Sequence, residues 1–153
     1  MKYVRDISSI ILIAGVMVLF NVFVTAPYLY DVVSGAPSKI ERWLETYKGW
    51  SIYLTGTSLV SALLWYVLSQ WFFKLNYWAK SGKRPVWSLL IAPPLLVTAI
   101  GIVLTPAAKE GMWLVYFFYF VSALIPYYLG TALFSPSSFK YAPVGSQLLR
   151  RWW

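Results

Sequence analysis

Four long, uncharged apolar segments constrain this chain more than any other feature. Each is close to the roughly 20 residues that a helix needs to cross about 30 Å of hydrocarbon. The segments are Ile7 to Val24, Trp50 to Phe73, Val86 to Leu104 and Met112 to Phe134. Backbone groups inside lipid must be paired within the segment, so each run is expected to be a helix. The sequence therefore predicts an all-α, integral membrane four-helix bundle.

Composition limits the chemistry of this bundle. The 153 residues are 59% hydrophobic and 12% charged, about half the usual charged share of roughly 25%. The chain has no cysteine, no histidine and only five carboxylates, which removes thiolate and imidazole metal sites and the commonest general base. We therefore expect no catalytic residue, no metal and no cofactor, and a protein that is not an enzyme.

The cations predict an orientation. If alternate connections lie on the same side of the membrane, one side holds nine Lys and Arg residues and the other holds four. The positive-inside rule then places both termini in the cytoplasm. Residues 1–134 form the predicted transmembrane domain and residues 135–153 a basic, aromatic cytoplasmic tail. The expected location is a bacterial inner membrane.

The first outer connection carries a helix signal of its own. Ser38 and Glu41 match a capping box, and Gly49 supplies a stop. Four apolar residues between them fall on one helical face. They are Ile40, Trp43, Leu44 and Tyr47. The pattern predicts a short amphipathic helix over about 38–48 that lies on the outer membrane surface, either as a lid on the bundle or as a docking surface.

Two cationic segments lie on the predicted cytoplasmic side. Loop 74–85 contains Lys74, Lys80, Lys83 and Arg84, and the tail ends with Arg150, Arg151, Trp152 and Trp153. Cations and tryptophans near a cytoplasmic membrane surface favour contact with anionic lipids. Both segments are also the expected contacts for a protein partner. Direct binding of nucleic acid is not expected, because orientation alone accounts for the charge.

Several unusual residues fall at one depth, about 11–13 Å from the predicted inner boundary. They are Gly15, Trp65, Tyr66, Pro93, Pro94 and Pro126. The double proline removes two backbone donors and frees the carbonyls of Leu89 and Leu90. One hypothesis is a cavity or hinge in this layer. The alternative is size matching, in which Trp65 or Tyr66 fills the space left by Gly15 and the kinks.

These features favour a non-enzymatic subunit or scaffold of a larger membrane-associated complex, of the secretion, conjugation, respiratory or phage-defence type. One alternative is a small homo-oligomeric channel or membrane sensor, and another is a membrane immunity or exclusion protein. Ser58 and Ala62 form a small-xxx-small pair in the second run. Such pairs favour close helix packing, within the chain or in a homo-oligomer.

Overall fold

The computed structural model of the chain describes residues 2–33, 37–72, 83–105 and 111–135, and these residues form helices and no strand. Four stretches are long and apolar enough to cross a membrane, by length and composition. They are Tyr3–Val32, Trp43–Trp71, Val86–Leu104 and Met112–Phe134. Large apolar side chains cover the outer faces, and Val103, for example, is 80% exposed. In the described residues, the expected all-helical fold with four candidate membrane spans is confirmed.

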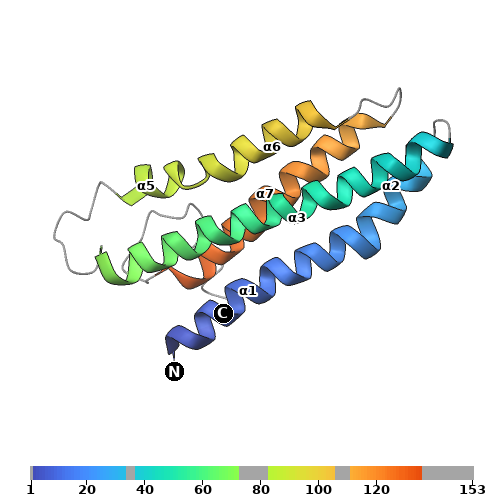
Figure 1. Cartoon of the computed structure of the whole chain (residues 1–153). Coiled ribbons are helices and arrows are strands. Elements are labelled where there is room, and N and C mark those ends of the chain that lie inside the picture. Colours follow the sequence, from blue (N-terminus) through green and yellow to red (C-terminus); the bar gives the residue numbers. More distant parts are fainter. Residues whose placement is uncertain (1, 34–36, 73–82, 106–110, 136–153) are drawn as a thin grey trace.

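The spans run up and down in alternate directions (Figure 1). Two of them contain a turn of π-helix, which we label η. In chain order the elements are α1 (Lys2–Phe20), η1 (Asn21–Thr25), α2 (Ala26–Val32), α3 (Pro37–Val67), η2 (Leu68–Phe72), α5 (Lys83–Leu89), α6 (Ala92–Leu104) and α7 (Met112–Phe134).

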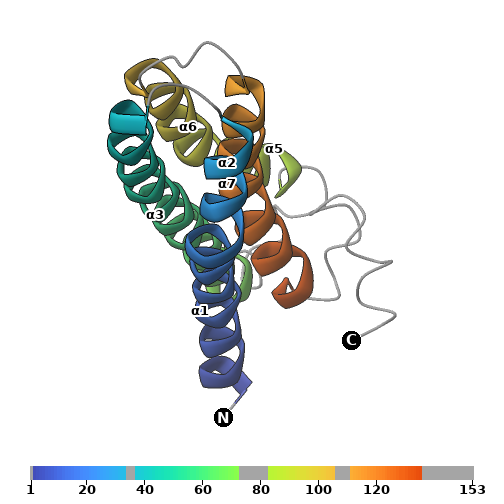
Figure 2. The ribbon, with the colours of Figure 1, turned by 90° about the vertical axis from the view of Figure 1, so that its right-hand side faces the viewer.

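Helices α3 and α7 form the centre of the bundle. They pack against each other, and each also packs against α1 and α6. In Figure 1 this central pair lies between α1 and α6. The start of α1 and the ends of α3 and α7 lie at the same end of the bundle (Figures 1 and 2). We call this the N-terminal end.

The first span is longer than the apolar run predicts. The chain stays helical past Val24, through η1 and α2, and bends between α1 and α2 (Figure 1). The extension packs into the core through the buried side chains of Ala26, Leu29 and Val33. Their three- to four-residue spacing keeps one face of the helix on the bundle.

The second span begins earlier than predicted, because α3 continues through Gly49 without a break. Residues 38–48 are helical, as expected, but they belong to the same helix as the second span. Trp43 and Tyr47 of the predicted surface face are buried in the bundle core, and Leu44 is partly buried against it. The side chain of Ile40 lies outside the described part. Burial of this face continues from Tyr47 to Ser51 and Leu54, so packing carries the helix past the glycine.

The third span is broken at Leu90 and Ile91, where a turn separates α5 from α6. The double proline explains the position, because Pro93 and Pro94 cannot donate to carbonyls one turn earlier. They occupy the start of α6, where the missing N–H groups cost least.

Small residues bring α3 and α7 close together. A Cβ added to Gly130 would lie 3.2 Å from the Ala62 Cβ and 3.4 Å from Cγ2 of Ile10. One turn before Ala62, the Ser58 hydroxyl donates to the carbonyl of Ala123 at 2.5 Å. The Ser58 and Ala62 pair therefore serves close packing within the chain.

Candidate functional site

The cationic residues predicted to contact a partner lie largely outside the described part of the chain. The backbones of Lys83 and Arg84 begin α5. The side chains of these two residues, together with Lys74, Lys80, Arg150, Arg151, Trp152 and Trp153, lie outside the described residues. Their roles stay predictions. The structure does describe the end of the bundle from which the loop and the tail leave.

The six residues that the sequence places at one depth are divided between the interior and the surface. The buried members are Trp65, Tyr66, Pro94 and Pro126, and the exposed members are Gly15 and Pro93. A Cβ added to Gly15 would meet nothing within 4 Å. No large side chain therefore packs into the space beside this glycine, and Gly15 does not belong with the buried members.

Next to the break in the third span, Trp87 of α5 is hydrogen-bonded to α7. Its indole Nε1 donates to the Thr131 hydroxyl at 3.0 Å, and its carbonyl accepts from the Tyr127 hydroxyl at 2.5 Å. The rings of Trp87 and Tyr127 stack with centroids 5.8 Å apart. Near the break, α7 therefore donates a hydrogen bond to the carbonyl of Trp87. The sequence had predicted that the carbonyls of Leu89 and Leu90 would need such a donor.

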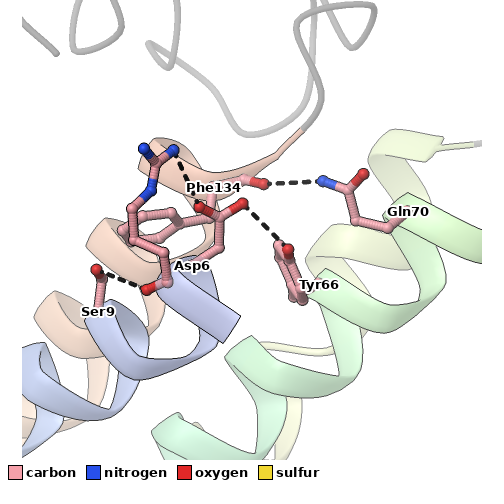
Figure 3. A network of polar contacts seen from close by, with 6 residues as sticks. Asp6, Ser9, Tyr66, Gln70 and Phe134 are labelled. Carbon is pink, nitrogen blue, oxygen red and sulfur yellow. Dashed lines mark hydrogen bonds and ion pairs between the residues drawn. The ribbon is translucent and has the colours of Figure 1, made fainter. Parts of the chain in front are cut away.

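A polar cluster lies at the N-terminal end, shown in Figure 3. Asp6 is the one charged side chain that is buried among the described residues. The Tyr66 hydroxyl donates to Asp6 Oδ2 at 3.1 Å, and the guanidinium of Arg5 lies 3.5 Å from Oδ1. A buried carboxylate is costly without such partners. This contact therefore holds the start of α1 against the end of α3.

The same cluster includes the end of α7. Gln70 Nε2, in η2, donates to the carbonyl of Phe134 at 3.4 Å (Figure 3), and the Trp65 indole donates to the Ser135 hydroxyl at 2.6 Å. We refer to Asp6, Trp65, Tyr66, Gln70 and Ser135 as the terminal cluster. It connects three helix ends through side-chain hydrogen bonds.

A second polar cluster lies around η1, near the opposite end of the bundle. Asn21 Nδ2 donates to the Ser122 hydroxyl at 2.9 Å, and the Tyr47 hydroxyl donates to Asn21 Oδ1 at 3.1 Å. All three side chains come from different spans. A single buried amide therefore joins the first, second and fourth spans.

Aromatic rings extend this second cluster. Trp43 and Tyr47 are stacked with centroids 6.1 Å apart, and Tyr47 stacks on Tyr119 at 5.5 Å with an interplanar angle of 4°. The Tyr119 hydroxyl lies 2.9 Å from the Thr105 hydroxyl, at the end of α6. We call Asn21, Thr25, Trp43, Tyr47 and Ser122 the η1 cluster.

Sequence reasoning missed Asp6 as an interior residue. The signal was present, because Asp6, Ile10, Ala14, Met17 and Asn21 recur every three or four residues and are all buried. This spacing places an acid and an amide on the inner face of one helix. The helices that supply their partners are not visible in such a local pattern.

Neither cluster gathers metal ligands. In the described residues, no three His, Cys, Asp or Glu side chains lie together so that they could hold a metal ion. The chemistry that the clusters offer is hydrogen bonding between helices.

Comparison with known proteins adds no relative to this picture: no family model, no curated protein and no solved structure matches the chain. Functional inference therefore depends on the geometry of the bundle itself.

Proposed function

We propose that the protein is a non-enzymatic integral membrane subunit or scaffold of a larger membrane-associated complex, of the secretion, conjugation, respiratory or phage-defence type. In this proposal the protein lies in a bacterial inner membrane, with both termini in the cytoplasm. There it presents loop 74–85 and tail 135–153 to a protein partner, close to the anionic lipids of the inner leaflet.

The terminal cluster is the observation that supports this proposal. The basic loop begins directly after η2, and the tail begins directly after α7. Gln70 and Trp65 tie these two helix ends together, and Tyr66 ties α3 to Asp6 near the start of α1. Both basic segments therefore leave the membrane domain from one end, where hydrogen bonds connect the helix ends. A common, fixed origin favours binding of both segments to one partner, because less freedom is lost on binding.

The buried polar groups of the bundle support a structural role as well. The side chains of the terminal cluster form hydrogen bonds to groups on other elements. In the η1 cluster the same holds for Asn21, Tyr47 and Ser122. Hydrogen bonds across helices stabilise membrane bundles by about 1 kcal/mol each. Polar residues used in this way position helices, which is what a scaffold requires.

Co-purification from membranes tests the proposal. A tagged protein is isolated in mild detergent, and its complex is sized on native gels and identified by mass spectrometry. We expect a complex larger than the protein and its own oligomers. Replacing Lys74, Lys80, Lys83 and Arg84 with glutamine should remove the partner even from molecules whose tail still lies in the cytoplasm by cysteine labelling, because the loop loses the charge that contacts it.

Two control variants sharpen the interpretation. Replacing Lys39, Arg42, Lys48 and Lys109 with glutamine removes four cations from the other predicted side and should leave the complex intact. Exchanging lysine and arginine within loop 74–85 keeps its charge and should do the same. Self-association alone, or a partner that survives the loss of all four loop cations, would contradict the proposal. Ion conductance of the purified protein in liposomes would favour the channel instead.

A further inference from the structure

The break in the third span interrupts the backbone hydrogen bonds of that helix. Before the break, the amide of Leu90 bonds to the carbonyl of Val86 at 3.0 Å. After it, Pro93 and Pro94 have no N–H group and cannot bond to the carbonyls four residues earlier. Hinges in proteins are often a few residues at the end of an element, where changes in backbone angles are absorbed. The backbone therefore allows α5 to change direction relative to α6.

The two parts of the third span are held in the bundle differently. The backbone of α6 packs closely against α3 and α7, and Pro94, Thr98 and Gly101 of α6 are buried. Helix α5 has seven residues, and Trp87 supplies two hydrogen bonds between α5 and α7, at 3.0 and 2.5 Å. Leu89, two residues later, is 70% exposed. The attachment of α5 therefore depends strongly on Trp87.

Helix α5 covers a buried tryptophan of the second span. Trp65 of α3 is fully buried, and the side chains of Val86, Trp87 and Leu90 pack against it. The indole N–H of Trp65 donates to the hydroxyl of Ser135 at 2.6 Å. Trp65 therefore contacts α5 through its ring and the first residue of the tail through its N–H group.

A second route connects α5 to the start of the tail. The Ser135 hydroxyl donates to the carbonyl of Thr131, and the hydroxyl of Thr131 accepts from the Trp87 indole. Ser135 is thus connected to α5 both through Trp65 and through Thr131. A change in the position of α5 should therefore affect the residue from which the tail begins.

We propose that α5 is a hinged segment that couples loop 74–85 to tail 135–153. In the closed state, which the structure shows, Trp87 is bonded to α7 and covers Trp65. When α5 turns about Leu90 and Ile91, these contacts are lost together, and Trp65 no longer holds Ser135. This inference deepens the proposed function, since it rests on the proposal that these two segments bind the partner. A partner that displaces α5 through the loop thereby releases the start of the tail.

Opening of α5 breaks few interactions. The prolines already interrupt the backbone bonds across the break, so the hydrogen bonds to α7 are the main polar contacts that are lost. A hydrogen bond between membrane helices changes the ratio of two states about fivefold. Loss of both Trp87 bonds should therefore lower the ratio of closed to open α5 about thirtyfold.

Distances between spin labels in nanodiscs test the hinge. The chain contains no cysteine, so labels attach only to introduced cysteines. The α5 pair is Leu12→Cys on α1 with Leu89→Cys, and these positions are 66% and 70% exposed. The α6 pair combines Leu12→Cys with Leu96→Cys, which is 64% exposed and lies beyond the break. In the wild-type background we expect one distance population for each pair.

Removing the two bonds of Trp87 should open the hinge. Tyr127→Phe removes the hydroxyl that donates to the Trp87 carbonyl, and Thr131→Val removes the acceptor of its indole. In the double variant, the α5 pair should gain a second distance population as the closed-to-open ratio falls, and the α6 pair should stay unchanged. Thr55→Val is the matched control, because its buried hydroxyl donates within α3, and it should change neither pair.

Ser135→Ala tests the coupling to the tail. The Ser135 hydroxyl bonds to Trp65 and to the carbonyl of Thr131, which lie on α3 and α7. If the position of Trp65 couples the tail to α5, S135A should also give the α5 pair a second population, smaller than in the double variant. An unchanged α5 pair in S135A would contradict the coupling.

The hinge itself has its own contrary outcomes. An α5 pair that is unchanged in the double variant would overturn the proposal, and so would equal changes in both pairs, because α5 and α6 would then move as one helix. These measurements use the protein without a partner. Their failure is therefore distinguishable from the loss of a partner in co-purification, which tests the proposed function.

Discussion

Individual buried polar residues in this protein act as links between spans that are distant in the chain. Asn21 and Ser122 are hydrogen-bonded although 101 positions separate them, and Asp6 and Tyr66 are bonded across 60 positions. In a bilayer, apolar helix faces gain little by leaving lipid for each other, because both surroundings are apolar. These polar pairs therefore contribute specificity to the choice of neighbouring helix.

The Tyr66 to Asp6 hydrogen bond gives a prediction for a single residue. Tyr66→Phe leaves the buried carboxylate without its phenol donor, and we expect a loss of about 1–3 kcal/mol in the free energy of unfolding. Denaturant titration of the protein in detergent micelles measures this value.

Tyr53→Phe is the matched control, because Tyr53 belongs to the same helix and is 67% exposed. It should change stability by less than about 0.5 kcal/mol. Equal effects of the two substitutions would show that the Asp6 contact contributes nothing.

Among the elements, the two π turns coincide with the two polar clusters. Asn21 and Thr25 are buried in η1, and η2 contains Gln70 and the buried Ser69. A π turn holds one more residue per turn of backbone hydrogen bonding than an α-helix, so it shifts which side chains face inward. Here the shift places polar side chains between helices.

Close approach of helices gives a second prediction, based on Gly130. Gly130→Ala places a Cβ 3.2 Å from the Cβ of Ala62, and neither group is flexible. Gly15→Ala meets nothing within 4 Å and should be neutral or slightly stabilising. We expect G130A to be less stable than G15A by about 1–3 kcal/mol, as measured by unfolding in detergent. Equal stabilities would mean that α3 and α7 can separate at no cost.

Sequence reasoning predicted the existence of the spans better than their ends or their contacts. Span detection depends on summed apolarity, which is a local property of each run. The continuation of α3 through Gly49 depends on burial of Trp43 and Tyr47 against other helices, which overrides a local stop signal. The break at Leu90 and Ile91 could be predicted in part, because Pro93 and Pro94 interrupt the helical hydrogen bonds. The two polar clusters could not be predicted, since the hydrogen-bond partners of each residue lie on other spans.

For the whole molecule, the distribution of cations predicts the orientation in the membrane. Replacing the four cations of loop 74–85 with glutamine lowers the predicted inner count of Lys and Arg from nine to five, against four outside. We expect mixed or inverted insertion as a result. The chain contains no cysteine, so one cysteine added to the tail reports its side by labelling with a membrane-impermeant reagent.

The control for this experiment removes the four cations of the opposite side instead. That change increases the asymmetry and should keep a single orientation. Unchanged labelling after neutralisation of loop 74–85 would show that other segments determine the topology. If the partner were lost in the same variant, partner contact would be the main role of the loop.

The unbroken α3 also has a mechanical consequence. Its 31 residues extend about 46 Å at 1.5 Å per residue, whereas the hydrocarbon core is about 30 Å thick. Such a helix must tilt or project from the bilayer. Because α3 packs against the other three spans, a change in its tilt moves the whole bundle. The protein should therefore respond to membrane thickness, and thinner lipids should incline α3 further.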